Sequence, residues 1–378
     1  MTRKFRIFAP MLGFDPDSNL GGEVYDVTLL TELARRGHQI EAVLRRGQKA
    51  PKMKNIGVHY LPYRMKTGLF SMSVLPWLFK TRRMKQIYKQ CDVFRVHSPY
   101  FMAVGAHFAR KTEKCPPIWY NYNMIEKNLK MRIFDKVMPR YCDGVTTVSN
   151  DELEHLEAVC HTVREKPSKV IFNSINMDIF RPLNAEEIRK KHGIKKDDIV
   201  LIYVGLVIHR KGIDIVLRAW EKLYKEFKNI HLVVIGKGSY SSEISRTASE
   251  TGRLHYLPYV GSRETLVKYY NSADMFIFPT RKESFGLVVA EAMACGLPIV
   301  TTNARGVRYV VTDECGFKVN VNDENAFLEK IKLLIRDEKL RNRLGDGGIK
   351  RIKEEFTVES NADKAEVFIE RMVEDAKG

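Results

Sequence analysis

Short apolar runs alternate with helix-forming stretches along almost the whole chain, and this alternation strongly constrains the fold. It is typical of parallel sheets covered by helices on both faces. A chain of 378 residues is also too long for one ordinary core. We therefore predict an α/β protein with two doubly wound domains. The predicted strands are 5–11, 39–44, 93–97, 118–122, 144–149 and 169–173 in the first half and 199–205, 230–236, 254–259, 275–279 and 298–303 in the second.

Two glutamates in the second half lie where a carboxylate is costly. Glu283 follows a predicted strand, and Glu291 is the one charged residue in the helix-forming segment 287–294. Charged side chains are almost never fully buried unless they are paired or hydrogen-bonded, and sugar hydroxyls are suitable donors. Gly286, at the helix start, would let a ligand approach the backbone. The alternative is a solvated acid beside a strand and a partly exposed glutamate in a packing helix.

The segment from Glu283 to Pro298 resembles the Glu-x7-Glu signature of the retaining glycosyltransferases of family 4. Its sequence is Glu-Ser-Phe-Gly-Leu-Val-Val-Ala-Glu-Ala-Met-Ala-Cys-Gly-Leu-Pro. Further matches are Gly21-Gly22-Glu23, Asn173-Ser-Ile-Asn-Met-Asp178, Tyr203-Val-Gly205, Lys211-Gly212 and Val234-Ile-Gly236. The resemblance therefore covers nearly the whole chain. It implies the GT-B fold, in which two Rossmann-like domains have a cleft between them.

The domain boundary is predicted near residues 173–182, because Pro182 and a helix signal after Asn184 mark the start of a new unit. The resemblance implies that residues 1–172 form an N-terminal Rossmann-like acceptor domain. It implies that residues 173–357 form a C-terminal Rossmann-like domain for the nucleotide-sugar donor. A final helix, 358–378, would cross back onto the first domain.

The resemblance also implies roles for single residues. Glu283 and Lys211 would act in catalysis, and Lys211 lies at a strand-to-helix turn, where an anion is favoured. Glu291 would hold the ribose hydroxyls of the donor. The residues expected to bind the donor are Gly21, Gly22, Gly205, Gly236, Phe285, Gly286, Leu287 and Glu291.

The chain departs from the family pattern at two positions. Leu206 stands where relatives usually carry an arginine, and Arg210 is the candidate to supply the missing charge; the alternative for Arg210 is a solvated surface cation. Asn123 stands where many relatives have a histidine near the reacting sugar. Asparagine cannot titrate but still forms hydrogen bonds, so Asn123 would position the sugar, or alternatively only cap a helix. His97 ends a predicted strand and is either a site residue or a hydrogen-bonded loop histidine.

Neither a metal nor a cofactor is expected. The pattern Asp15-Pro16-Asp17 lies in a polar loop and is predicted to be solvated, and enzymes with the GT-B fold need no metal for catalysis. The six cysteines lack metal-ligand spacing, which indicates a reduced, cytoplasmic compartment. The first apolar run is too short for a signal core, and the sequence contains no predicted bilayer-spanning segment.

The formal net charge of +17 is concentrated in the first half. Residues 42–91 contain twelve Lys or Arg and no Asp or Glu. We name this segment the acid-free window. Apolar and cationic side chains are adjacent within it, as in interfacial membrane segments. They are Trp77, Phe79, Lys80, Arg82, Arg83 and Lys85. The alternative is a core helix followed by a solvated basic helix, and nothing in the sequence resembles a nucleic-acid-binding motif.

These observations predict a cytoplasmic glycosyltransferase that is peripheral on the cytosolic face of an anionic membrane. It would move a hexose from a nucleoside diphosphate sugar to a glycan or lipid-linked acceptor with retention of configuration. Two alternatives remain open from the sequence. One is a sugar-nucleotide binding protein without catalysis, which is suggested by the departures from the family pattern at Leu206 and Asn123. The other is a GT-B nucleotide-sugar epimerase.

Overall fold

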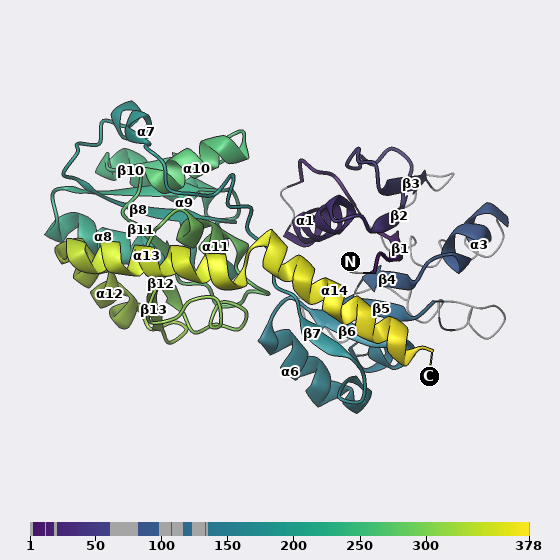
Figure 1. Ribbon diagram of the computed structural model, residues 1–378. Coiled ribbons are helices and arrows are strands. Elements are labelled where there is room, and N and C mark those ends of the chain that lie inside the picture. The colour runs from purple at the N-terminus through teal and green to yellow at the C-terminus, as the bar shows by residue number, and fades with distance from the viewer. Residues whose placement is uncertain are drawn as a thin grey trace. The chain divides into compact units, whose positions relative to one another are not determined.

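The computed structural model describes residues 3–11, 13–18, 21–60, 82–97, 107, 116–122, 133 and 135–377, and for residues 82–85 and 97 it describes the backbone alone. The chain forms two compact units, which are labelled by element in Figure 1. Unit 1 comprises Met1–Ser174 and Val358–Gly378, and unit 2 comprises Ile175–Thr357.

Unit 1 contains a seven-stranded parallel sheet with the strand order β3-β2-β1-β4-β5-β6-β7. Its strands are β1 Arg6–Pro10, β2 Gln39–Leu44, β3 Ile56–Tyr60, β4 Val93–His97, β5 Ile118–Tyr122, β6 Gly144–Thr147 and β7 Ser168–Val170. The order reverses between β1 and β4. In doubly wound sheets, ligands bind at the carboxyl ends of the strands beside such a reversal.

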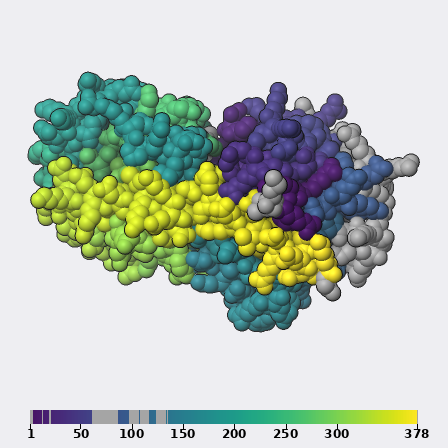
Figure 2. All heavy atoms as spheres, viewed as in Figure 1, coloured from purple at the N-terminus to yellow at the C-terminus, as the bar shows by residue number. Residues whose placement is uncertain are grey.

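The described helices of unit 1 come from both the N-terminal and the C-terminal parts of the chain. They are α1 Gly21–Arg35, α3 Arg82–Lys89, α6 Asn150–Val159 and α14 Val358–Asp375, with the 3-10 turns η1 Met138–Tyr141 and η2 His161–Val163. The α14 helix, yellow in Figure 2, packs against α1 and β7. Its apolar face is buried, and the Phe368 ring lies 5.7 Å from that of Trp119. Asn361 joins this helix to the backbone N–H of Phe172 and to the Ser174 hydroxyl, each at 3.1 Å.

Unit 2 contains a six-stranded parallel sheet with the order β10-β9-β8-β11-β12-β13. Its strands are β8 Ile199–Val204, β9 Ile230–Ile235, β10 Leu254–Leu257, β11 Met275–Phe278, β12 Ile299–Thr302 and β13 Gly316–Val319. Every residue of β9 and β11 is buried, as expected for strands covered on both faces. The order reverses between β8 and β11. The two parallel-sheet units confirm the predicted fold class.

Helices cover both faces of the second sheet. They are α7 Glu186–Lys191, α8 Ile213–Glu226, α9 Ser241–Thr251, α10 Arg263–Asn271, α11 Leu287–Ala294, α12 Glu324–Arg336 and α13 Glu338–Glu355, with the 3-10 turn η3 His209–Lys211. No helix in the described part of the chain combines the length and apolar character needed to cross a bilayer. The five cysteines described are free and buried.

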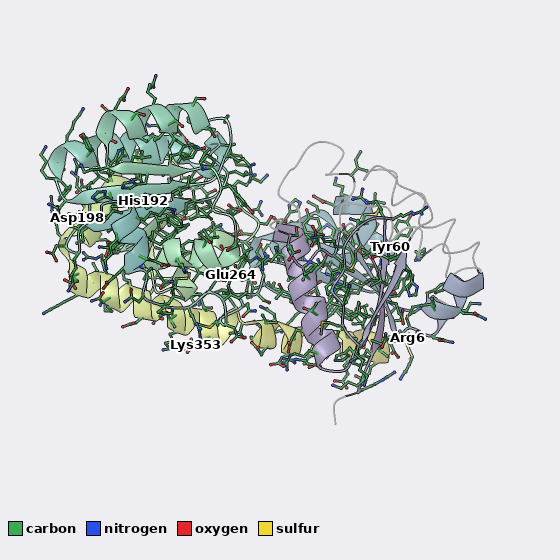
Figure 3. The ribbon with its side chains drawn as sticks, turned by 90° about the horizontal axis from the view of Figure 1, so that it is seen from above. Arg6, Tyr60, His192, Asp198, Glu264 and Lys353 are labelled. Atoms are coloured by element: carbon green, nitrogen blue, oxygen red, sulfur yellow. The ribbon has the colours of Figure 1, made fainter. Side chains whose placement is uncertain are left out.

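Three histidines pack together at the amino ends of the unit 2 strands. His231 lies 3.0 Å from the ring nitrogen of His255 and 3.2 Å from the Asp198 carboxylate, and the rings of His192 and His255 are 4.8 Å apart. Figure 3 labels His192 and Asp198. Burial lowers the pKa of all three histidines, that of His255 to about 4, so the cluster is neutral at pH 7. It lies at the edge of the sheet opposite the candidate site.

Candidate functional site

The candidate site is formed by the loops at the carboxyl ends of β8 and β11, where the strand order of unit 2 reverses. Lys211 and Gly212 follow β8, and Glu283 follows β11. Neighbouring parallel strands bring their following loops together at one edge of a sheet. Residues that are 72 positions apart in sequence therefore meet as Lys211 and Glu283.

Two glycines allow the loops after β8 and β9 to approach each other. Gly205 has φ 145° and Gly236 has φ 136°. A Cβ on Gly236 would lie 1.9 Å from the carbonyl oxygen of Gly205, so no other residue fits there. Leu206, which directly follows Gly205, is 51% exposed, and its aliphatic side chain brings no charge to this loop.

The η3 turn carries Lys211 against the loop after β11. Gly212 ends the turn in the left-handed conformation with φ 75°, and a Cβ there would lie 1.9 Å from the carbonyl oxygen of Pro279. The backbone N–H of Arg281 donates to the carbonyl of Arg210 at 2.9 Å. The Arg210 guanidinium reaches the Lys282 carbonyl at 3.3 Å. The turn is thus held by backbone contacts as well as by side chains.

Lys211 and Glu283 form an ion pair through Nζ and Oε1. Their side chains are 13% and 7% exposed, and the ammonium also lies 5.7 Å from the centre of the Phe278 ring. The backbone N–H of Glu283 donates to the Arg305 carbonyl at 3.2 Å. Such a desolvated pair is favourable only while both partners are present. A ligand can therefore bind either charged group if it supplies a group that takes the place of that group's present partner.

Gly286 and Gly306 shape the backbone around Glu283. Gly286 precedes α11 with φ 89°, and a Cβ on Gly306 would lie 2.5 Å from the Glu283 carbonyl oxygen. The hydroxyl of Ser284 is buried and has no hydrogen-bond partner in the described structure. Phe285 is a core residue, with its ring edge-on to Phe356 at 5.5 Å. Only the Phe285 backbone is therefore placed to meet a ligand.

Glu291 lies in α11 and accepts a hydrogen bond from the Tyr270 hydroxyl at 3.0 Å. Burial raises the pKa of this carboxyl to about 7, although the Tyr270 hydrogen bond and the Arg263 charge oppose the shift. The carboxyl is therefore partly protonated near neutral pH in the free protein. A buried carboxylate needs a hydrogen-bond donor, and here that donor is the Tyr270 hydroxyl, which the sequence motif did not reveal.

The sequence-predicted residues of unit 1 lie at its own strand reversal. Gly21 and Gly22 open α1 after β1, and His97 ends the neighbouring β4. Glu23 organises the preceding loop, because its carboxylate accepts from the Asp15 N–H at 2.8 Å and the Ser18 hydroxyl at 2.7 Å. This role of Glu23 was not predicted from the sequence, although its position beside the two glycines was a signal.

Several predicted residues cannot be placed in a site. Asn123, Trp77, Phe79 and Lys80 lie outside the described residues. The acid-free window is described over 42–60 and 82–91, so Arg82, Arg83 and Lys85 appear as backbone at the start of α3. No group of three or more His, Cys, Asp or Glu side chains that could hold a metal ion occurs among the described residues.

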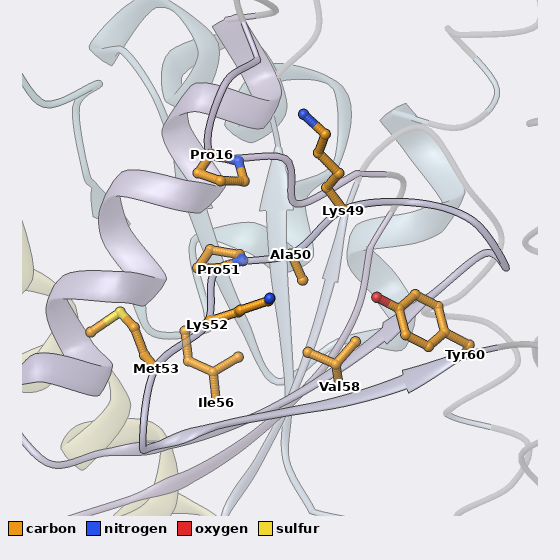
Figure 4. A pocket seen from close by; sticks show the side chains of 9 residues that line it. All are labelled: Pro16, Lys49, Ala50, Pro51, Lys52, Met53, Ile56, Val58 and Tyr60. Carbon is orange, nitrogen blue, oxygen red and sulfur yellow. The ribbon is translucent and has the colours of Figure 1, made fainter.

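A hollow of about 670 Å³ lies on unit 1 beside β3 (Figure 4). Its floor is apolar, and two lysines stand at its rim. Met53 and Tyr60 in its wall are 37% and 47% exposed. The lining includes Pro16, Lys49, Pro51, Lys52, Met53, Ile56, Val58 and Tyr60. All of these except Pro16 belong to the acid-free window.

Comparisons with known proteins identify the family. A family model described as "Glycosyltransferase Family 4" matches residues 21–179, and one described as "Glycosyl transferases group 1" matches residues 184–351. This chain belongs to the family 4 type of glycosyltransferases. Both units are covered, and the family predicted from the sequence is confirmed.

One curated relative of this glycosyltransferase is similar along nearly the full chain, and solved structures of lower identity share its fold. The capsular polysaccharide biosynthesis glycosyltransferase CapM of Staphylococcus aureus is 25% identical over 368 residues, which cover 92% of this chain and 93% of CapM. Sucrose-phosphate synthase from Thermosynechococcus elongatus has the same fold, with a TM-score of 0.80 at 19% identity, covering 99% of this chain and 100% of that one. Anabaena HepE, solved in complex with UDP and glucose, has a TM-score of 0.73 at 16% identity, covering 96% and 98%.

We predict that Gly212→Ala destabilises the glycosyltransferase far more than Gly193→Ala. Both glycines are left-handed, with φ 75° and 65°, but a Cβ at Gly193 meets nothing within 4 Å. The Gly193 change should cost about 1 kcal/mol, the ordinary penalty for this conformation, and the Gly212 change about 3 kcal/mol or more. Urea unfolding of both variants measures the difference. Equal losses would show that the η3 turn is not sterically fixed against Pro279.

Proposed function

We propose that this glycosyltransferase moves a hexose from a nucleoside diphosphate sugar to an acceptor with retention of anomeric configuration. The observation that carries the proposal is the Lys211–Glu283 pair on adjacent loops at the strand reversal of unit 2, followed by Glu291 on α11. HepE, a structural neighbour, has been solved with UDP-glucose, so UDP-glucose is the first donor to test.

The donor would be held by groups of opposite character. Glu291 would accept hydrogen bonds from the ribose hydroxyls. Glu283 and the backbone at residues 285–287 would hold the sugar. Lys211, with Arg210 beside it, would stabilise the negative charge that develops on the diphosphate as it leaves. Transfer needs neither a metal nor a further cofactor in this proposal, because the cations and the helix N-terminus provide the electrostatic stabilisation.

Binding of the donor would separate the ion pair found in the free protein. A diphosphate oxygen replaces the Glu283 carboxylate as the partner of Lys211, and a sugar hydroxyl replaces the ammonium as the partner of Glu283. Both charges remain satisfied throughout. This exchange avoids the cost of leaving either group unpaired in a site where their side chains are 13% and 7% exposed.

The acceptor would be a glycan or a lipid-linked alcohol at the cytosolic face of an anionic membrane. The acid-free window supports this, since it places cations around the hollow on unit 1. Lys49 is bonded to the exposed Asp17 at 3.1 Å, and Lys52 is exposed at the rim. An anionic, partly apolar acceptor matches this combination of charge and apolar floor.

A second candidate is sugar-nucleotide binding without transfer. The exposed Leu206 favours it, because an aliphatic side chain cannot replace the arginine fork on a phosphate. Donor binding without turnover or donor hydrolysis would decide for this candidate.

We predict that Glu283→Gln and Glu291→Gln each lower kcat/KM for UDP-glucose and leave the protein folded, although Glu283→Gln also lowers the stability because it leaves the Lys211 ammonium without its charged partner. Loss of a charged hydrogen bond to a sugar or ribose hydroxyl costs roughly 1.5–3 kcal/mol, or about ten- to hundredfold in efficiency. UDP release with a polyprenyl-linked sugar acceptor measures the effect. Glu250→Gln, at an exposed position of α9, is the matched control and should be unaffected. Normal turnover in both site variants would refute the assignment.

Affinity for UDP-glucose should rise with pH through the pKa of Glu291, which is about 7 in the free protein. The ionised carboxylate accepts the ribose hydroxyls, so protonation below pH 7 opposes binding. Between pH 6 and 8 we expect a rise of about tenfold, as for a single required deprotonation. Calorimetric titration at these pH values checks it. Glu291→Gln should abolish the rise, and a rise that persists in that variant would assign the titration to another group.

Replacement of Lys80, Arg82, Arg83 and Lys85 by Gln should weaken binding to anionic vesicles by several kcal/mol, at about 1 kcal/mol for each cation. Binding of the unchanged protein should also weaken as salt rises. Vesicle sedimentation measures both effects.

The matched control changes four exposed lysines of unit 2 to Gln. It gives the same change in net charge and should leave vesicle binding as it was. The control positions are Lys190, Lys191, Lys195 and Lys196. If the unchanged protein ignores anionic vesicles at low salt, the acid-free window is a solvated surface and the acceptor is soluble.

A further inference from the structure

Arg281 lies two residues before Glu283, and its side chain is bonded to three other segments of unit 2. It donates through Nη1 to the His209 carbonyl at 2.5 Å. It binds both carboxylate oxygens of Asp214, through Nη1 and Nη2 at 2.7 and 2.8 Å. Its Nε donates to the side-chain oxygen of Asn322 at 2.7 Å. These partners lie in the η3 turn, the first turn of α8 and the loop after β13.

The contacts of Arg281 fix the turn that carries Lys211. Its side chain holds the carbonyl of His209, and its backbone N–H holds the carbonyl of Arg210 at 2.9 Å. These are the two residues immediately before Lys211. The Thr280 hydroxyl also reaches the Arg210 carbonyl, at 3.3 Å. One short segment, 280–283, therefore binds the η3 turn and places Glu283 beside Lys211.

The surroundings of Arg281 favour an arginine over a lysine. Its side chain is 17% exposed and that of Asp214 is 7% exposed, so the charges are largely withdrawn from water and need each other. The two adjacent guanidinium N–H groups match the carboxylate, while Nε–H is left for Asn322. Asn322 has φ 68°, and among the described residues it is the one non-glycine with a positive φ. A lysine at 281 would keep the charge and lose most of these bonds.

We propose that Arg281 is a positioning residue for glycosyl transfer, which holds the η3 turn against the Glu283 loop and so sets the spacing of Lys211 and Glu283. The inference rests on the proposed function of that pair. Arg281 itself need not touch the donor. It acts through Lys211, so its loss should matter only while the lysine is present.

A double-mutant cycle tests this directly. Arg281→Lys and Arg281→Gln should each lower kcat about tenfold and leave UMP affinity within twofold. In the Lys211→Ala background, Arg281→Gln should change kcat by less than twofold. Arg218→Gln is the matched control, because Arg218 also binds Asp214, at 2.9 Å, while its other bonds in the described structure go to Glu324 on α12 and not to the η3 turn. That variant should keep kcat within twofold.

Each other outcome overturns the inference. A tenfold loss from Arg281→Gln in both backgrounds would show that Arg281 does not act through Lys211. Full activity of Arg281→Lys would show that a positive charge at this position is enough. Equal losses of kcat in the Arg218 and Arg281 variants would show that the loss comes from disturbing Asp214, which both arginines bind. Circular dichroism confirms folding of each variant.

The same cycle measured as UDP affinity separates this inference from the proposed function. If the unchanged protein transfers no sugar, the proposed function fails. The coupling of Arg281 to Lys211 in UDP binding then still decides the positioning role. We expect Arg281→Gln to weaken UDP binding about tenfold with Lys211 present and less than twofold without it. Equal weakening in both backgrounds would reject the positioning role.

Discussion

The ion pair between Lys211 and Glu283 is the interaction on which the rest of the site depends. Two opposite charges in a weakly hydrated place are stable only as partners, and each is then ready to bind a ligand group of the other's charge. In the function proposed above, the cation of this pair would meet a donor phosphate and the adjacent carboxylate would meet a sugar hydroxyl.

Steric constraints keep the pair together before any ligand arrives. Gly212 and Gly306 allow backbone contacts that a Cβ would prevent, at 1.9 and 2.5 Å from neighbouring carbonyl oxygens. Gly236 does the same between the loops after β8 and β9, where a Cβ would lie 1.9 Å from the Gly205 carbonyl oxygen. The site is therefore formed where loops approach each other closely at a strand reversal. The ion pair between Arg281 and Asp214 holds these loops together. Charged groups that are already in position need little rearrangement when charge develops on a substrate.

The fold could be predicted because strands buried on both faces carry continuous apolar runs, as residues 232–235 of β9 do. The edge strands β3 and β13 were missed. Both are partly exposed and include glycine and polar residues, such as His59 and Lys318, so their apolar pattern is weak. Glu291 was singled out because a carboxylate in an apolar helix-forming segment is conspicuous, and Glu283 because it begins the Glu-x7-Glu pattern; their roles stay a prediction.

The partners of the site residues could not be predicted in the same way. Tyr270 is 21 residues from Glu291, and Asp214 is 67 residues from Arg281. Which residues meet across such separations is decided by the strand order, which periodicity does not specify. Arg281 lies inside the recognised segment, yet nothing in its immediate sequence indicates that it binds the turn before Lys211. The candidate residues could therefore be named from the sequence, and the contacts that position them could not.

Hydrogen exchange of the full chain, with and without saturating UDP-glucose, tests the central claim most directly. The account predicts slower exchange in unit 2 at residues 205–212 and 283–291, with the strongest protection at the η3 turn and the start of α11. ADP-glucose and GDP-mannose serve as alternative donors if UDP-glucose does not bind. Protection confined to unit 1, or none with any of the three donors, would contradict the assignment of the Lys211–Glu283 pair as the donor site.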